Sequence, residues 1–198
     1  MTDTAEIAGL VGSRICHDLI SPVGAIGNGL ELIGLTGGQP GPELDLISES
    51  VGNANARIRF FRIAFGLSGS EQMVSEREIQ SILDGISVGA RLQIDWTVQG
   101  AVERTDLRLA FLAFMCMETA LPYGGLVSIC HDSAGWSLFG EGRALKVDPD
   151  LWEPITRGQA PDRVIPAHVQ FALFPLVASD HDRQISVEHT ETRLTLRF

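Results

Sequence analysis

The residues with the clearest chemical potential are a histidine and an aspartate that follow one another near the N-terminus, His17 and Asp18. Apolar residues around this pair recur at intervals of three and four, which is the spacing of one face of an amphipathic helix. They are Ile15, Leu19, Pro22, Ile26, Leu30 and Ile33. At about 100° per residue His17 lies roughly opposite that face, so we expect it to be exposed. A neutral imidazole there is a nucleophile that another macromolecule can reach at pH 7.

The helix face around His17 is predicted to be open and shallow, because its residues are mostly small or polar. We expect it to consist of Ser13, Arg14, Ile20, Ser21 and Gly24. Small residues such as Ser21 and Gly24 allow close approach by a partner. Ile20 is either an apolar anchor for that partner or a surface hydrophobic residue that needs no explanation.

A carboxylate beside His17 can orient the ring or accept its second proton, and Asp18 is the candidate. Adjacent residues on a helix point about 100° apart, however, so Ser13 and Ser21 are better placed to contact the ring. The stretch from His17 to Val23 resembles the phosphoacceptor box of histidine kinases, in which His, an acidic residue, Leu and Pro recur at the same positions. Ile20 and Val23 depart from that box. The resemblance implies that His17 accepts a phosphoryl group; the alternative is an ordinary surface histidine.

The composition restricts the class of protein. The chain has 198 residues, of which 44% are hydrophobic and 20% are charged, so it can bury a sizeable core. Its net charge of -10 argues against a nucleic-acid backbone or an anionic membrane as partner. The sequence has no apolar run near ~18 residues and starts with an acidic segment, which predicts neither a transmembrane helix nor a signal peptide. Three sparse cysteines favour a reduced, cytoplasmic protein.

The elements that must position His17 are two helices. The first runs from about Thr4 to Gly34, with a bend expected at Pro22, and the second from about Pro42 to Leu67. The second helix carries a heptad seam of apolar residues. The seam consists of Leu44, Ile47, Val51, Ala54, Ile58, Phe61 and Phe65. One antiparallel hairpin has too little interior to bury both stripes, so we expect a homodimer with a four-helix bundle. Alternatively, the seam packs on the rest of its own chain.

A glycine- and serine-rich stretch at 66–70 predicts a boundary between a hairpin domain, 1–68, and a second domain, 72–198. Helices and strands are mixed in the second domain, so the fold class is α+β. The expected elements are a helix opened by the capping box Ser75–Glu78, a strand at 92–98, a helix at 106–121, a hairpin within 125–139, helices within 148–156 and 167–178, and a final hairpin at 184–198. This order resembles the ATP-binding α/β sandwich of histidine kinases.

The motifs of that ATP-binding domain are degenerate here. Thr119 stands where the family has its magnesium-binding Asn, and the glycine pair at 140 and 142 lacks the preceding Asp. The position of the glycine-rich phosphate loop reads Val164–His168, with no glycine. We therefore expect neither ATP nor a metal ion to bind. A zinc site formed by Cys16-His17 and Cys130-His131 is a weaker alternative, because the spacing within each pair is wrong.

Together these features resemble the ChpT-type histidine phosphotransferases over essentially the whole chain. The resemblance implies a transferase that carries a phosphoryl group on His17 between aspartates of receiver domains, one in a hybrid histidine kinase and others in response regulators. The receivers would supply Mg²⁺, so no cofactor is expected. Two alternatives stay open: a histidine kinase with an unusual ATP site, and a non-catalytic scaffold that docks receivers.

Overall fold

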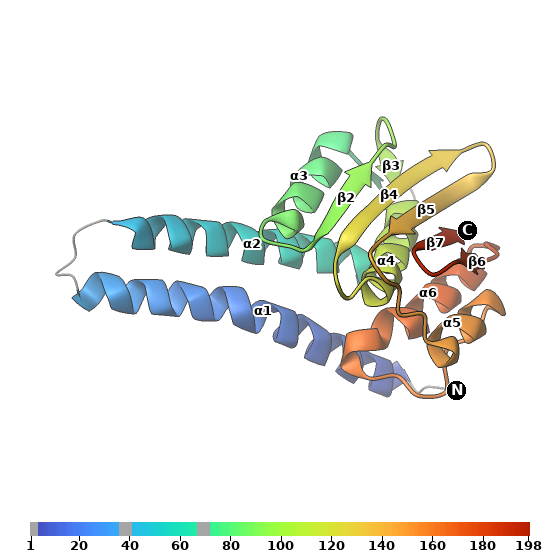
Figure 1. The fold of residues 1–198 in the computed structure, drawn as a ribbon, viewed down its shortest axis with the longest axis horizontal. Coiled ribbons are helices and arrows are strands. Elements are labelled where there is room, and N and C mark those ends of the chain that lie inside the picture. The colour runs from blue at the N-terminus through green and yellow to red at the C-terminus, as the bar shows by residue number, and fades with distance from the viewer. Residues whose placement is uncertain (1–3, 36–40, 67–71) are drawn as a thin grey trace.

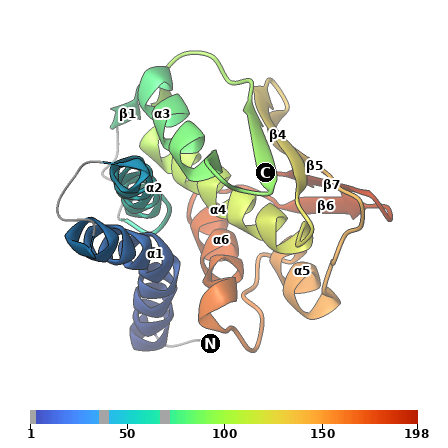
Figure 2. The same ribbon diagram turned by 60° about the vertical axis from the view of Figure 1, so that its left-hand side comes forward.

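The computed structural model of the chain describes residues 4–35, 41–66 and 72–198. The N-terminal part is an antiparallel hairpin of two long helices, α1 (Thr4–Leu35) and α2 (Pro42–Ala64), which extends away from the rest of the molecule (Figure 1). Helix α1 continues through Pro22, which has no N–H to donate a hydrogen bond to the preceding turn. Figure 2 shows that the helix is bent along its length. The predicted hairpin is therefore present.

The C-terminal part is an α/β unit whose elements follow the predicted order. They are β1 (Met73–Val74), α3 (Glu76–Ser87), β2 (Leu92–Trp96), β3 (Val102–Glu103), α4 (Arg104–Ala120), β4 (Gly125–Asp132), β5 (Gly135–Glu141), α5 (Pro149–Thr156), the 3₁₀ turn η1 (Pro166–His168), α6 (Val169–Asp180), β6 (Ser186–His189) and β7 (Arg193–Arg197). Ser75 caps α3, since its hydroxyl accepts a hydrogen bond from the Glu78 amide at 3.2 Å, as the capping box predicts.

The main sheet has five strands in the order β2-β4-β5-β7-β6. Only β2 and β4 pair in parallel, and every other neighbouring pair in this sheet is antiparallel. Helices α3, α4 and α6 cover one face of the sheet, between it and the hairpin (Figure 2). The α+β class with a sandwich of helices on a sheet is confirmed. The short pair β1 and β3 was not predicted, because two-residue strands leave no alternation in the sequence.

The last turns of α2 and the α/β unit share one hydrophobic core. Phe60, Phe61 and Ile63 are buried in the same cluster as α4, and the Phe60 ring stacks on Phe111 with 4.4 Å between the centroids. The hairpin is thus anchored at its base by aromatic packing. The predicted domain boundary falls largely on 67–71, outside the described residues. Among the residues described, no helix is both long enough and apolar enough to cross a membrane.

The seam of α2 is only partly covered by its own chain. Ala54 and Phe61 are buried, and Ile47 packs close to Gly29 of α1. The seam residues Leu44, Val51 and Ile58, seven positions apart, are instead between two-fifths and one-half exposed. On α1, Val23 and Leu30 are also exposed, although Leu30 belongs to the predicted apolar face. The isolated chain therefore leaves part of the predicted interior of the bundle in contact with solvent.

Candidate functional site

His17 lies on α1 at the edge of a groove between the two helices of the hairpin. Its side chain is 84% exposed, as the periodicity predicts. The groove has a volume of about 440 Å³. Its walls are His17, Asp18, Ser21, Pro22 and Ala25 from α1, and Leu46, Glu49, Ser50, Asn53 and Arg57 from α2. The imidazole therefore stands beside a long, open depression that both helices shape.

The His17 ring is held by its neighbour in the sequence. Nδ1 of His17 lies 3.1 Å from Oδ1 of Asp18, whose own side chain is only 12% exposed. A carboxylate can only accept a hydrogen bond, so the neutral ring carries its proton on Nδ1 and leaves the Nε2 lone pair free. The hydrogen bond of the ring is made to Asp18 and, among the described residues, not to Ser13 or Ser21, because the Asp18 side chain spans the angle between adjacent positions.

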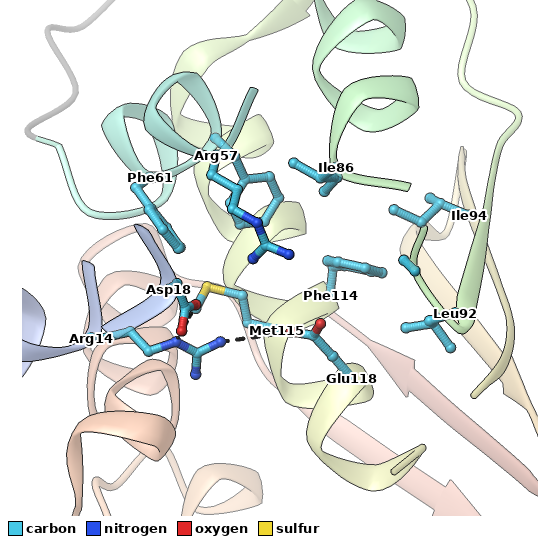
Figure 3. Close-up of a pocket in the computed structure, with 12 residues that line it drawn as sticks. Arg14, Asp18, Arg57, Phe61, Ile86, Leu92, Ile94, Phe114, Met115 and Glu118 are labelled. Carbon is cyan, nitrogen blue, oxygen red and sulfur yellow. Dashed lines mark hydrogen bonds and ion pairs between the residues drawn. The ribbon is translucent and has the colours of Figure 1, made fainter. Parts of the chain in front are cut away.

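Arg14 is not part of the open face, contrary to the sequence-based expectation. Its side chain is 14% exposed and turns toward the C-terminal unit. Nε donates to Oδ2 of Asp18 at 2.7 Å, and one terminal nitrogen donates to the Ala167 carbonyl at 2.7 Å. The other terminal nitrogen lies 3.7 Å from a carboxylate oxygen of Glu118 (Figure 3). Helical periodicity placed Arg14 near His17 but gave no sign that η1 and α4 flank this part of α1.

The other predicted contact residues do lie on the outside of α1. Ser13, Ser21 and Gly24 are exposed, and a Cβ on Gly24 would meet no atom within 4 Å. Ile20 is 68% exposed, a large apolar surface for one side chain. Their contact with a partner stays a prediction, since the described structure holds a single chain.

The α2 wall of the groove was missed by the sequence analysis. Leu46, Glu49, Asn53 and Arg57 recur at intervals of three and four, so they share one helix face. The heptad seam drew attention to a different face of the same helix. Arg57 is the cation of this wall; its Nε donates to Oδ1 of Asn53 at 3.0 Å. Among the residues described, no carboxylate lies within 4 Å of Arg57, so its charge is not neutralised by an ion pair.

Comparison with known proteins decides the family. The family model for the histidine phosphotransferase C-terminal domain matches residues 76–193. The protein phosphotransferase ChpT of Brucella abortus (strain 2308) is 33% identical over 194 residues, which cover 93% of this chain and 91% of the relative. The chain belongs to the ChpT family of histidine phosphotransferases. A solved structure of a bacterial phosphotransferase has 28% sequence identity and a TM-score of 0.76, covering 99% of this chain and 97% of its own.

In this histidine phosphotransferase, the positions that resemble a nucleotide site are filled by packing. A Cβ on Gly140 would lie 2.8 Å from Cε of Met117, and one on Gly142 would lie 2.5 Å from Cδ2 of Leu121. The end of α4 and Leu121, the residue after it, therefore press against Gly140 in β5 and Gly142 just beyond that strand. The segment that follows β5 is also held at the end of α4, because the Lys146 amide donates to the Ala120 carbonyl at 2.9 Å.

Thr119, which stands where the resemblance to histidine kinases would put a magnesium-binding Asn, makes its hydrogen bonds within the protein. Its hydroxyl donates to the Met115 carbonyl at 3.1 Å and accepts from Nε2 of Gln170 at 2.9 Å. Gln170 is fully buried beneath α4. Within the described part of the chain, no three His, Cys, Asp or Glu side chains are grouped so that they could hold a metal ion.

Glu118 lies in a small cavity of about 50 Å³ between the hairpin and the α/β unit, which Arg14, Asp18 and Arg57 also line (Figure 3). The surrounding walls partly remove the carboxylate from water, which raises its pKa, whereas the charges of Arg14 and Arg57 act in the opposite direction. Half of the Glu118 side chain remains accessible to solvent, so the desolvation is incomplete. Glu118 thus faces α1 and its Arg14.

Proposed function

We propose that His17 carries a phosphoryl group between receiver domains, taking it from an aspartate of a hybrid histidine kinase and giving it to an aspartate of a response regulator. The observation that carries the proposal is the His17 ring itself, 84% exposed beside an open groove, with Nδ1 engaged by Asp18 and Nε2 free. Phosphoryl transfer depends mainly on positioning and charge neutralisation. A fixed, accessible imidazole provides the positioning.

The proposed reaction is two displacements at phosphorus. Nε2 of His17 attacks the phosphorus of an aspartyl phosphate, an N–P bond forms, and the P–O bond to the donor aspartate breaks. The phosphorylated ring is cationic while Nδ1 keeps its proton, and the Asp18 carboxylate at 3.1 Å stabilises that charge. A carboxylate of the acceptor receiver then attacks the same phosphorus, and the imidazole leaves with its electron pair.

The groove gives each receiver a surface on both helices. Ser13, Ile20, Ser21 and Gly24 of α1 offer small or apolar contacts around the ring. Arg57 on the α2 wall brings a cation that has no carboxylate within 4 Å among the described residues, which suits the charge on a phosphoryl group. The chain itself needs no cofactor in this proposal, because the Mg²⁺ that accompanies the aspartyl phosphate belongs to the receiver.

The kinase alternative is less well supported. Met117 and Leu121 occupy the space beside Gly140 and Gly142 where the resemblance would put a nucleotide, and Thr119 is engaged with Gln170. A triphosphate would have to displace this packing and would still lack the glycine-rich loop. We therefore propose a transferase that has a phosphohistidine intermediate and no ATP-dependent autokinase activity.

We also propose that the working form is a homodimer, in which two hairpins make a four-helix bundle. The support is the exposed series Leu44, Val51 and Ile58 on α2, together with Val23 and Leu30 on α1. Exposed apolar residues in heptad spacing are the signature of a helix seam without its partner. We place the reaction in the cytoplasm, a reducing compartment, which the three free cysteines suit.

The test is transfer without nucleotide. A receiver domain labelled at its aspartate with ³²P-acetyl phosphate is mixed with this protein, and the label is followed over time. We expect wild-type protein to acquire a base-stable, acid-labile label, as a phosphohistidine does, and His17→Gln to acquire none. His181→Gln, which removes an exposed histidine outside the groove, should behave as wild type.

Three outcomes would contradict the proposal, and the first two would favour its alternatives. Label acquired from radioactive MgATP in the absence of any receiver would identify a histidine kinase. Binding of the receiver with no label on wild-type protein would identify a docking scaffold. Transfer that persists in His17→Gln would remove His17 as the carrier.

A further inference from the structure

Arg14 connects the phosphoacceptor helix to the C-terminal unit. Its guanidinium is nearly buried and is met by groups from α1, α4 and η1: the Asp18 carboxylate, Glu118 and the Ala167 carbonyl. A guanidinium is planar, with N–H donors in fixed directions, so three partners around it determine its position more tightly than one partner would. The C-terminal unit therefore determines where Arg14 lies.

Arg14 in turn determines where the Asp18 carboxylate lies. One oxygen of Asp18 accepts from Nε of Arg14 at 2.7 Å and the other faces Nδ1 of His17 at 3.1 Å. The first contact is charge-assisted and largely shielded from water, since both side chains are less than one-sixth exposed. The second reaches an 84% exposed ring that has no other hydrogen-bond partner among the described residues. Without Arg14, Asp18 would be free to turn away from the ring.

We propose that Arg14 is a positioning residue through which the C-terminal unit fixes the orientation and tautomer of His17. The chain of contacts runs from the Ala167 carbonyl and Glu118, through Arg14 and Asp18, to Nδ1. Holding the proton on Nδ1 keeps Nε2 as the nucleophile. This inference rests on the proposed function for its catalytic consequence, but the tautomer itself is a property of the resting protein. It gives the C-terminal unit a part in phosphoryl transfer that requires no nucleotide.

The direct test is the tautomer of His17. Long-range ¹H–¹⁵N spectra of uniformly labelled full-length protein distinguish a protonated Nδ1 from a protonated Nε2, and the His17 signals are assigned by their loss in His17→Gln. A free neutral imidazole prefers the proton on Nε2. We expect wild-type protein to show the Nδ1–H tautomer at a pH where the ring is neutral, and Arg14→Gln to shift toward Nε2–H.

The same variants are then compared in single-turnover transfer from the labelled receiver. We expect Arg14→Gln to lower the maximal transfer rate at least tenfold with little change in the receiver concentration that gives half of that rate. Arg59→Gln is the matched control: Arg59 also joins the hairpin to the C-terminal unit, lying 3.7 Å from Glu78 and 3.1 Å from the Ser81 hydroxyl, but it does not touch Asp18. It should keep the wild-type tautomer and rate.

An Arg14→Gln protein that is folded, keeps the Nδ1–H tautomer and transfers at the wild-type rate would overturn the proposal. If that variant does not fold, Arg14→Lys decides, because it keeps the charge but lacks the Nε–H: an unchanged tautomer and rate would overturn the proposal equally, and a shifted tautomer with a slower rate would support it. A wild-type protein that never takes label would refute the proposed function instead, and it would leave the tautomer result intact.

Discussion

His17 and Asp18 show how a residue pair acquires a geometry that its own spacing does not provide. Neighbours on a helix diverge by about 100°, yet the Asp18 carboxylate reaches Nδ1 while its other oxygen binds Arg14 one turn earlier. The carboxylate lies between a buried cation and an exposed ring. Its charge is thereby held close to the ring on which positive charge would develop in the proposed phosphorylation of His17.

Apart from the His17–Asp18 pair, Arg57 is the side chain of the groove for which we expect the clearest effect on rate. Its cation lines the depression beside His17, and no described carboxylate lies within 4 Å of it. We expect Arg57→Gln to slow transfer from a labelled receiver by about tenfold, or ~1.4 kcal/mol, because a charge opposite the phosphoryl oxygens is lost. Arg62→Gln, on the same helix but outside the groove, should not slow it. Single-turnover measurements that give equal rates for both variants would contradict this role.

The helix pair depends on one close approach near its far end. A Cβ on Gly29 would lie 2.6 Å from Cγ1 of Ile47, whose branched side chain has little freedom to move. Gly52 of α2, in contrast, has open space around it and is a matched control. We expect Gly52→Ala to raise the free energy of unfolding by up to about 1 kcal/mol through helix propensity. The free energy of unfolding of Gly29→Ala, measured in urea, should be about 1–3 kcal/mol lower than that of Gly52→Ala. Equal gains in the two variants would show that the helices are not closely packed at Gly29.

The elements that sequence periodicity reveals are those whose apolar pattern is local. The two hairpin helices, the capping box at Ser75 and the long apolar helix α4 are predicted within a few residues of their ends. Strands β1 and β3 could not be predicted, because each has two residues and is defined only by its partner. The outward position of His17 likewise follows from the helix alone.

The parts of the site that could not be predicted are contacts between elements distant in the sequence. Arg14 turns inward because η1 and α4 lie beside α1, more than 100 residues away along the chain, and no spacing within α1 indicates that. The α2 wall of the groove required knowledge of how the two helices are rotated against each other. The seam predicted the apolar residues of α2 and that one hairpin could not bury all of them, but it did not indicate that Leu44, Val51 and Ile58 would be the exposed ones.

At the scale of the whole molecule, the exposed seam predicts the oligomeric state. We expect Val51→Glu to convert a dimer into a monomer in light-scattering measurements, lowering the mass from twice to once the chain mass of 21.4 kDa. The physical reason is that two carboxylates would be brought into one apolar interface, where each is costly to desolvate. Gln80→Glu, which adds the same charge on the exposed face of α3, should stay dimeric. A wild-type protein that is monomeric at micromolar concentration would contradict the bundle.

In the proposed reaction the donor and acceptor receivers both dock in the groove beside His17, so they would compete for the same surface. A receiver that has delivered its phosphate must depart before the next can collect it, so the two exchanges alternate in time. An excess of either receiver in its unphosphorylated form would then inhibit binding of the other. The rate of phosphoryl transfer would pass through a maximum as the concentrations of the receivers rise. The ratio of the two receiver concentrations in the cell, and not only their affinities, would determine the overall rate of phosphoryl transfer.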